Sequence, residues 1–326
     1  MNFNKSSAQI EVKKISRRSL VKGLFMGGIG LSLGTALLYR SKDKPMPTLF
    51  SYRKKVMGTW VAITIFCDSE QKAIAASDAA FEQVQLVDSL LSIFKKDSQI
   101  SLLNSFAGDR ALAVDPRVTA VLKRSQHFSN LTGGVYDISI LPLMKLWGFY
   151  GHGRSKVPTD TEIALALDPV DWKSIDISGN NIFLKRRGAG IDLGSIGKGY
   201  AIDLAVEALK KQGITSALVD AGGNLFAMGA PYGDPDPRVG WRVAIRNPRQ
   251  EGESLDVIEL RDKAVATSGK DQTFVKIGSQ EIGHIFNAIT GTEASAYLSA
   301  TAVSATATDS DALSTTAYLV GPEKVE

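Results

Sequence analysis

Two short segments of the chain carry residue types suited to holding a phosphate and a metal ion. In the first, residues 192–200 read DLGSIGKGY, so three glycines and Lys198 stand at the start of a helical pattern. Backbone N–H groups at such a junction can bind a phosphate at the positive end of the helix dipole. The segment is not a P-loop, because its spacing is shorter and Gly199 stands where that motif requires Ser or Thr. A plain tight turn is the alternative interpretation.

The second segment lies near the end of the chain, where Asp311 and Thr315 are four residues apart. On a helix they would share one face, with their Cβ atoms roughly 6 Å apart. A carboxylate and a hydroxyl are the hard oxygen ligands that suit Mg²⁺, which completes its shell with water and phosphate. The alternative is an aspartate that caps a helix, followed by a threonine that faces solvent.

The number and positions of the histidines and of the single cysteine limit which catalytic, zinc and disulfide sites are possible. Of the three histidines only His284 lies in a run that predicts a strand, where it is either a structural residue or an acid–base catalyst. The histidines are scattered and Cys67 is the only cysteine, which disfavours a zinc site. A single cysteine also excludes an internal disulfide and a multi-cysteine metal site.

The composition is that of a globular protein, with 326 residues, 44% hydrophobic and 22% charged. The net charge of +4 is unevenly distributed, because residues 1–55 carry +10 and the remainder carries −6. The folded part therefore lacks the clustered basic surface that nucleic-acid binding needs, and no nucleic-acid partner is expected.

The first fifty residues are typical of an export signal. The sequence SRRSLVK at 16–22 precedes an apolar run over 23–39, which matches the twin-arginine pattern. The alternative is an uncleaved membrane anchor. We therefore expect residues 1–50 to be a signal or anchor and the rest to be periplasmic or extracytoplasmic. An uncleaved signal would tether it to the inner membrane.

The remaining residues, 51–326, predict one intertwined α+β unit of mixed sheets with flanking helices. We expect a strand over 57–66, a helix to Leu91 opened by a capping box at Asp68, and a helix after Asp115. A short strand over 191–193 should precede a third helix, which stops at Gly213. Further expected elements are strands at 216–220, 241–246, 255–260, 273–277 and 282–286, and a last helix from about 309.

Eight motifs in order over residues 56–321 resemble those of the ApbE family, the FAD:protein FMN transferases. They are MGT at 57–59, S-x-F…S-x-I-S-x-L-N over 92–104, GVYDIS at 134–139 with PL at 142–143 and LWGF at 146–149, DLGSIGKGYA at 192–201, DAGGN at 220–224, TSG at 267–269, HI at 284–285 with TG at 290–291, and DALST at 311–315. The resemblance implies the α+β, T-fold-related architecture of that family.

The resemblance also implies an activity, a cofactor and partners. Such enzymes cleave the FAD pyrophosphate and transfer FMN through a phosphoester bond to a Thr or Ser hydroxyl of a partner flavoprotein, releasing AMP. Matched positions would bind Mg²⁺ through Ser195, Asp311 and Thr315, and would place His284 in the acid–base role. Positions that would contact FAD are Met57, Phe94, Val135, Tyr136, Asp137, Asp192, Lys198 and Ile285. The acceptor is expected to belong to a membrane electron-transfer system, and the signal implies the twin-arginine export machinery as a further partner.

Three departures from the family pattern keep other functions open. Asn287 and Ala288 replace the usual Asp-Pro after the histidine, and Lys270 and Asp271 follow TSG in place of the expected tyrosine. The chain ends at Glu326, before a helix and strand that relatives usually add, so we expect a short branch or a truncated sequence. The alternatives are a non-catalytic exported protein that binds or delivers FAD, and a Mg²⁺-dependent FAD pyrophosphatase.

Overall fold

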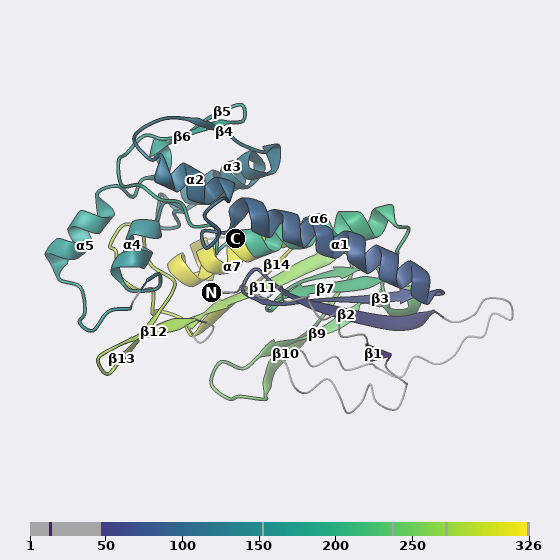
Figure 1. Cartoon of the computed structure of the whole chain (residues 1–326). Coiled ribbons are helices and arrows are strands. Elements are labelled where there is room, and N and C mark those ends of the chain that lie inside the picture. Colours follow the sequence, from purple (N-terminus) through teal and green to yellow (C-terminus); the bar gives the residue numbers. More distant parts are fainter. Residues whose placement is uncertain (1–12, 15–46, 152, 237, 271–272, 325–326) are drawn as a thin grey trace, which may run out of the picture. The chain divides into compact units, whose positions relative to one another are not determined.

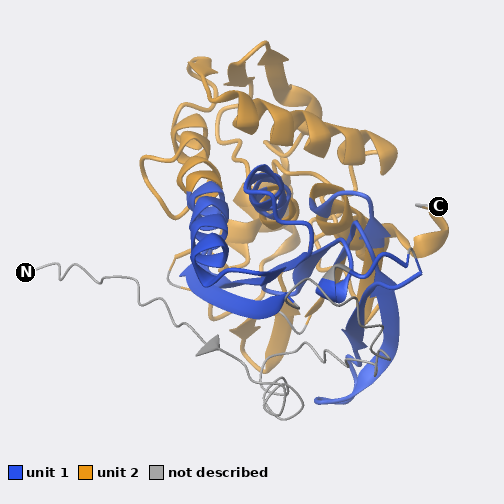
Figure 2. Ribbon diagram, turned by 90° about the vertical axis from the view of Figure 1, so that its right-hand side faces the viewer, with its two compact units in different colours: residues 1–85, 201–265, 303–307 blue, residues 86–200, 266–302, 308–326 orange. Residues whose placement is uncertain are grey.

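The computed structural model describes residues 13–14, 47–151, 153–236, 238–270 and 273–324. Almost all of the predicted signal segment 1–50 thus lies outside the described residues, and its boundary stays a prediction. The chain divides into two compact units, coloured separately in Figure 2. Unit 1 comprises residues 1–85, 201–265 and 303–307, and unit 2 comprises 86–200, 266–302 and 308–326. No helix within the described ranges is long and apolar enough to cross a membrane.

The largest sheet has seven strands in the order β1-β2-β3-β7-β8-β11-β14 (Figure 1). Their bounds are β1 (Lys13–Lys14), β2 (Thr48–Val56), β3 (Thr59–Cys67), β7 (Ala217–Ala221), β8 (Asn224–Met228), β11 (Lys263–Gly269) and β14 (Ser299–Ser304). Neighbours from β2 through β11 run antiparallel. Strands β2 and β3 pair from Thr48 with Cys67 to Val56 with Thr59, which leaves only Met57 and Gly58 for the turn between them.

The strands of this sheet that belong to unit 1 carry buried apolar side chains on both faces. On β3, Val61, Ile63 and Ile65 alternate along the strand and are fully buried. Helices α1 (Glu70–Leu91) and α6 (Gly197–Lys211) lie along one side of this sheet in Figures 1 and 2. On the opposite side a second core joins Phe66 to Trp241 and to other residues of β9 (Trp241–Arg246) and β10 (Ser254–Leu260).

Unit 2 holds most of the shorter elements. Its helices are α2 (Gln99–Ser105), α3 (Pro116–Leu131), α4 (Leu141–Leu146), α5 (Asp160–Leu167) and, from Thr308 onward, α7 (Ala307–Val320). Its small sheets are β4-β6-β5, formed by Leu112–Ala113, Asn181–Leu184 and Ile175–Ser178, and the hairpin of β12 (Phe274–Ile277) with β13 (Gln280–Gly283). Short 3₁₀ helices span Trp172–Ser174 and Pro322–Lys324, and a third, Pro231–Gly233, belongs to unit 1.

An apolar cluster in unit 2 fixes the β12–β13 hairpin. We call it the hairpin cluster; it consists of Met144, Trp147, Ile277, Ile282 and Phe286. Phe149 and Tyr150 pack against it from the loop after α4. Because Ile282 and Phe286 flank residue 284, burial of the cluster holds the backbone on either side of the predicted catalytic histidine.

The predicted fold class is confirmed, since mixed sheets and flanking helices form the chain. Helix α1 ends at Leu91, and α3 follows the predicted cap, in which Asp115 Oδ1 accepts the Arg117 N–H at 2.9 Å. Helix α6 ends before Gly213, whose φ of +70° is the left-handed conformation that stops a helix.

Four local predictions were wrong. Met57 and Gly58 have φ of 53° and 72° and form a turn, so the strand begins at Thr59. The cap of α1 is Ser69 rather than Asp68, because the Ser69 carbonyl accepts the Ala73 N–H. Residues 191–193 form no strand. The fourth error concerns 282–286, since β13 ends at Gly283 and residue 284 follows it.

The missing strand at 191–193 has a physical reason. The side-chain amide of Asn104 donates to the Ile191 carbonyl at 2.9 Å and accepts the Ile191 N–H at 2.6 Å. One side chain therefore satisfies both backbone groups that a neighbouring strand would otherwise pair.

Candidate functional site

The glycine-rich turn at 192–199 is held in shape by its first residue. Asp192 is 9% exposed, and its Oδ1 accepts the Gly194 N–H at 2.7 Å. The Leu193 carbonyl accepts the Gly197 N–H at 2.8 Å, and α6 begins there. Lys198 extends back along the turn, where its Nζ donates to the Gly194 carbonyl at 3.1 Å. The turn thus leads directly into α6 and carries Lys198 at the start of that helix, while its binding of a phosphate stays a prediction.

The turn and the last helix meet within unit 2. Gly199, in the first turn of α6, donates its N–H to Asp311 Oδ2 at 2.9 Å. Asp311 is 4% exposed, so this bond joins a buried carboxylate to the positive end of a helix. The two segments that the sequence singled out therefore form one site.

Two hydroxyl groups extend this site. Ser195 Oγ donates to the Tyr136 hydroxyl at 2.9 Å. Burial of the Tyr136 ring, together with the nearby charge of Asp311, raises the pKa of the Tyr136 hydroxyl, although the bond from Ser195 opposes this. Tyr136 is therefore neutral and lies close enough to Asp311 to sense its charge.

Two hydroxyls of α7 lie against the backbone carbonyl of Asp311, to which Ser314 Oγ donates at 2.9 Å and Thr315 Oγ1 at 3.4 Å. Ser268 Oγ lies 2.8 Å from Ser314 Oγ and 3.1 Å from Thr315 Oγ1, and all three side chains are buried. Thr315 thus lies one turn after Asp311 on α7, and Ser195 contacts the Tyr136 hydroxyl, which senses the charge of Asp311. That Ser195, Asp311 and Thr315 bind one metal ion stays a prediction. This donor set fits a hard cation such as Mg²⁺.

Among the described residues, no group of three or more His, Cys, Asp or Glu side chains is placed to hold a metal ion. The predicted set contains a single carboxylate, so its members would not form such a group. Ser268 was not among the predicted site residues, although it belongs to the TSG motif at 267–269, one of the eight motifs that match the family.

His284 follows β13 and is oriented by the Thr273 carbonyl. Its backbone N–H donates to that oxygen at 3.2 Å, and its ring Nδ1 lies 3.1 Å from the same oxygen. A carbonyl oxygen can only accept, so this contact places the ring proton on Nδ1 and leaves a lone pair on Nε2. Burial lowers the pKa of His284 most, the hydrogen bond to Thr273 and the charge of Asp192 raise it, and the positive charge of Lys198 lowers it further, so that the net shift is downward. The neutral ring can therefore act as a base near the turn.

An ion pair supports the backbone in front of His284. Glu293 Oε1 accepts the Gly283 N–H at 2.6 Å and lies 3.1 Å from Lys270 Nζ. Lys270 is one of the departures from the family pattern, and it stabilises the end of β13. Its neighbour Asp271 lies outside the described residues.

The second departure, at residues 287–288, keeps a closed turn. Asn287 Oδ1 accepts the N–H groups of Ile289 at 2.9 Å and Thr290 at 3.2 Å, which are bonds that an aspartate would also accept. Gly291 is needed here, because its φ is +69° and an added Cβ would lie 2.6 Å from Ile163. The Ala288 N–H donates to the Val135 carbonyl at 3.1 Å, so this turn is joined to the predicted FAD-binding stretch.

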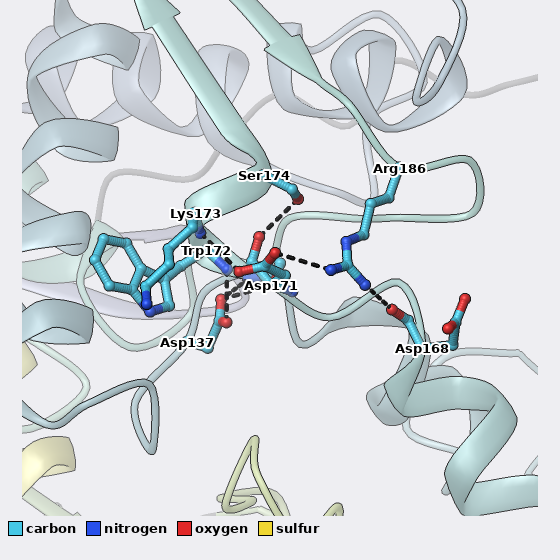
Figure 3. A network of polar contacts seen from close by, with 8 residues as sticks. Asp137, Asp168, Asp171, Trp172, Lys173, Ser174 and Arg186 are labelled. Atoms are coloured by element: carbon cyan, nitrogen blue, oxygen red, sulfur yellow. Dashed lines mark hydrogen bonds and ion pairs between the residues drawn. The ribbon is translucent and has the colours of Figure 1, made fainter.

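Both oxygens of the Asp137 carboxylate accept hydrogen bonds from other residues of unit 2. Its Oδ1 accepts both the N–H and the hydroxyl of Ser139 at 2.7 Å, and its Oδ2 accepts the Trp172 N–H at 2.8 Å (Figure 3). In the same network Arg186 donates to Asp171 Oδ2 at 3.1 Å and to the Asp168 carbonyl at 2.5 Å. These bonds fix the loop that carries Val135 and Tyr136. A pocket of about 350 Å³ lies beside it, lined in part by Gly134, Trp172 and Ala288.

The other predicted FAD-contacting residues differ in exposure. Phe94 is 78% exposed and presents its ring near the turn, with its centroid 5.5 Å from that of Tyr150. Ile285 is only 7% exposed, and Val135 is half-buried. Met57 belongs to unit 1, and its contact with FAD stays a prediction. Tyr150, which follows the LWGF motif directly, was absent from the predicted site.

The DAGGN motif lies in unit 1, in the hairpin turn between β7 and β8. Gly222 has φ of +63°, and an added Cβ would lie 2.6 Å from Thr59 Oγ1, so only glycine fits. Asp220 stands opposite Leu225 in the pairing, and burial raises the pKa of its carboxyl to about 6, partly offset by the Gly223 N–H bond.

Replacing Asp220 with asparagine is expected to stabilise the protein above pH 6. A folded-state pKa raised from 3.8 to about 6 means that the carboxyl is protonated more readily in the folded state. Its stabilising contribution is complete below about pH 4 and is lost as pH rises through 6. Asparagine keeps an acceptor for Gly223 and never ionises. We expect a gain of about 1–2 kcal/mol in unfolding free energy at pH 7.5, after allowance for solvent screening, and none at pH 4.

Urea unfolding of both proteins at pH 4 and pH 7.5 measures this difference. The exposed Glu82→Gln serves as the matched control and should change stability little at either pH. A gain that is equal at the two pH values would contradict the assigned cause.

Fold and site define an α+β protein in which a buried aspartate of the last helix accepts a hydrogen bond from the end of a glycine-rich turn. The model of the ApbE family matches residues 57–326, and the chain belongs to that family. This confirms the resemblance seen in the sequence.

Relatives of known name and structure agree with this assignment. The FAD:protein FMN transferase of Treponema pallidum is 31% identical over 289 residues, covering 84% of this chain and 80% of the relative. That of Vibrio cholerae is 28% identical over 301 residues, covering 90% and 88%. Among solved structures, the ApbE protein of Thermotoga maritima aligns with a TM-score of 0.77 at 28% identity, over 85% of this chain and 88% of that one. The flavin transferase ApbE of V. cholerae aligns with a TM-score of 0.73 at 27% identity, over 85% and 89%.

Proposed function

We propose that this protein is an exported enzyme that transfers FMN from FAD to a Thr or Ser hydroxyl of a partner flavoprotein. The reaction forms a phosphoester bond, releases AMP and requires Mg²⁺. The relatives named FAD:protein FMN transferase support the transfer. The observation that carries the proposal is the Gly199–Asp311 hydrogen bond, because it joins the phosphate-binding turn to the only carboxylate of the predicted metal set.

The residues of the site divide the chemistry between them. His284 would take the proton of the acceptor hydroxyl on Nε2, since its Nδ1 proton is committed to Thr273. The hydroxyl oxygen then bonds to the phosphorus of the FMN half, the pyrophosphate P–O bond breaks, and AMP leaves with the electron pair. Lys198 and the N–H groups of the turn would hold the phosphates. When bound by Ser195, Asp311 and Thr315, Mg²⁺ would neutralise charge on the pyrophosphate.

The proposed partners follow from the same chemistry and from the signal. FAD is the substrate, and the acceptor is a flavoprotein of a membrane electron-transfer system. The twin-arginine pattern at 16–22 supports export by that machinery to the periplasm, with tethering to the inner membrane if the signal is retained. Fractionation of cells that express the full chain tests the location.

One assay tests the activity against its two alternatives. The purified protein is mixed with FAD, Mg²⁺ and a flavoprotein domain that offers an acceptor threonine, and AMP and covalent flavin fluorescence are measured. We expect a fluorescent acceptor band and one AMP for each flavin transferred. FMN and AMP without a labelled acceptor would instead identify a pyrophosphatase, and bound but unchanged FAD would identify a carrier.

A further inference from the structure

Tyr150 connects three parts of the site that otherwise come from separate segments. Its hydroxyl donates a hydrogen bond to Asp192 Oδ2 in the glycine-rich turn. Its ring meets that of Phe94 at an interplanar angle of 72° with a centroid distance of 5.5 Å. Its other side packs on the hairpin cluster, whose members Ile282 and Phe286 flank His284.

The contact with Phe94 explains how an exposed aromatic ring keeps a fixed orientation. Phe94 is 78% exposed and lies in a short turn, in which its N–H donates to Ser92 Oγ at 3.3 Å. An edge-to-face contact with a half-buried ring restricts the rotation of such a side chain and leaves its other face open. An open, fixed aromatic face suits stacking by a flat ring system.

The contact with Tyr150 occupies the second of the two oxygens of the Asp192 carboxylate. Oδ1 accepts the Gly194 N–H, and Oδ2 accepts the Tyr150 hydroxyl. Burial and the adjacent charge of Asp192 raise the pKa of Tyr150, so the tyrosine stays protonated and continues to donate. The carboxylate is therefore held in place from both sides, which fixes the turn that carries Lys198.

We propose that Tyr150 is a positioning residue for FAD, which fixes the stacking face of Phe94 and the glycine-rich turn in one arrangement. This inference rests on the proposed function in that FAD is the ligand. It adds a residue that lies outside the set of matched family positions, and it predicts two separable effects, because the hydroxyl acts on Asp192 and the ring acts on Phe94.

Two variants separate the hydroxyl from the ring. Tyr150→Phe removes the bond to Asp192 and keeps the ring contact, whereas Tyr150→Leu removes both. For Tyr150→Phe we expect the KM for FAD to rise about 5- to 10-fold, less than the full value of a charge-assisted hydrogen bond because Tyr150 acts on FAD through Asp192, with kcat within about twofold of wild type. Bound flavin should stay quenched as in wild type. For Tyr150→Leu we expect a further rise in KM and a partial recovery of flavin fluorescence.

Direct titration of each protein with FAD, followed by flavin fluorescence, tests this without any transfer reaction. Tyr297→Phe, which removes a hydroxyl from an exposed tyrosine, is the matched control and should titrate as wild type. If both Tyr150 variants bind and quench FAD as wild type does, the inference is overturned. If wild type binds FAD but transfers no FMN, the proposed function fails while the titration still decides the role of Tyr150. If wild type does not bind FAD, both are overturned.

Discussion

Replacing Asp311 with alanine is expected to abolish Mg²⁺-dependent release of AMP, lowering kcat/KM by about 10²- to 10³-fold or more. Asp311 supplies the only negative charge in the predicted metal set, since Ser195 and Thr315 contribute neutral hydroxyls. Two neutral hydroxyls would not hold a divalent cation against water. AMP release is measured over a range of Mg²⁺ concentrations, and excess Mg²⁺ should recover little of the lost activity.

A second variant separates the metal role from a structural one. Asp311→Asn keeps an oxygen that can accept the Gly199 N–H, so the turn and α7 stay joined while the charge is lost. The matched control is Asp309→Ala, which removes a carboxylate on the same helix whose Oδ1 lies 2.6 Å from Arg124 Nε. We expect activity within about twofold of wild type for Asp309→Ala, because Asp309 pairs with Arg124 of α3 and lies outside the predicted metal set. Full Mg²⁺-dependent turnover in both Asp311 variants would remove the metal assignment.

Local signals in the sequence were sufficient for elements whose ends are set by nearby residues. The cap at Asp115 with Pro116 after it predicted the start of α3, and the left-handed glycine at 213 predicted the end of α6, because both depend on backbone chemistry within one turn. The order of the motifs along the chain supported the predicted fold class. The prediction that residues 192–200 and 311–315 lie together rested on chemistry, because a metal-bound pyrophosphate needs both segments.

Other features depend on contacts between distant residues and left no local pattern. Asn104 pairs the backbone of Ile191 from 87 positions away and so replaces the expected strand. The predicted strand at Met57 ignored the turn that two positive φ values create, since the β-branched and aromatic residues typical of a strand follow it directly. Tyr150 and Ser268 stand next to or inside recognised motifs, but only packing shows which groups their side chains reach.

Replacing His284 with alanine is expected to lower kcat for FMN transfer by about 10²- to 10⁴-fold, the usual contribution of a positioned general base, with FAD affinity nearly unchanged. The reason is its orientation, because Thr273 holds Nδ1 and leaves Nε2 to accept a proton. Single-turnover transfer measures the chemical step, and a fluorescence titration measures FAD binding. His127→Ala, at an exposed position on α3, is the matched control and should leave both values unchanged.

The pH dependence of the same step provides an independent test of this role. A base must be neutral to accept a proton, so the transfer rate should rise with pH through the folded-state pKa of His284 and then level off. Burial and the charge of Lys198 lower that pKa from 6.5, so the midpoint of the acid limb should lie below 6.5 in wild type. In His284→Ala this limb should disappear, because no group replaces the lone pair on Nε2. Loss of FAD binding with an unchanged acid limb would instead identify His284 as a structural residue of the β13 turn.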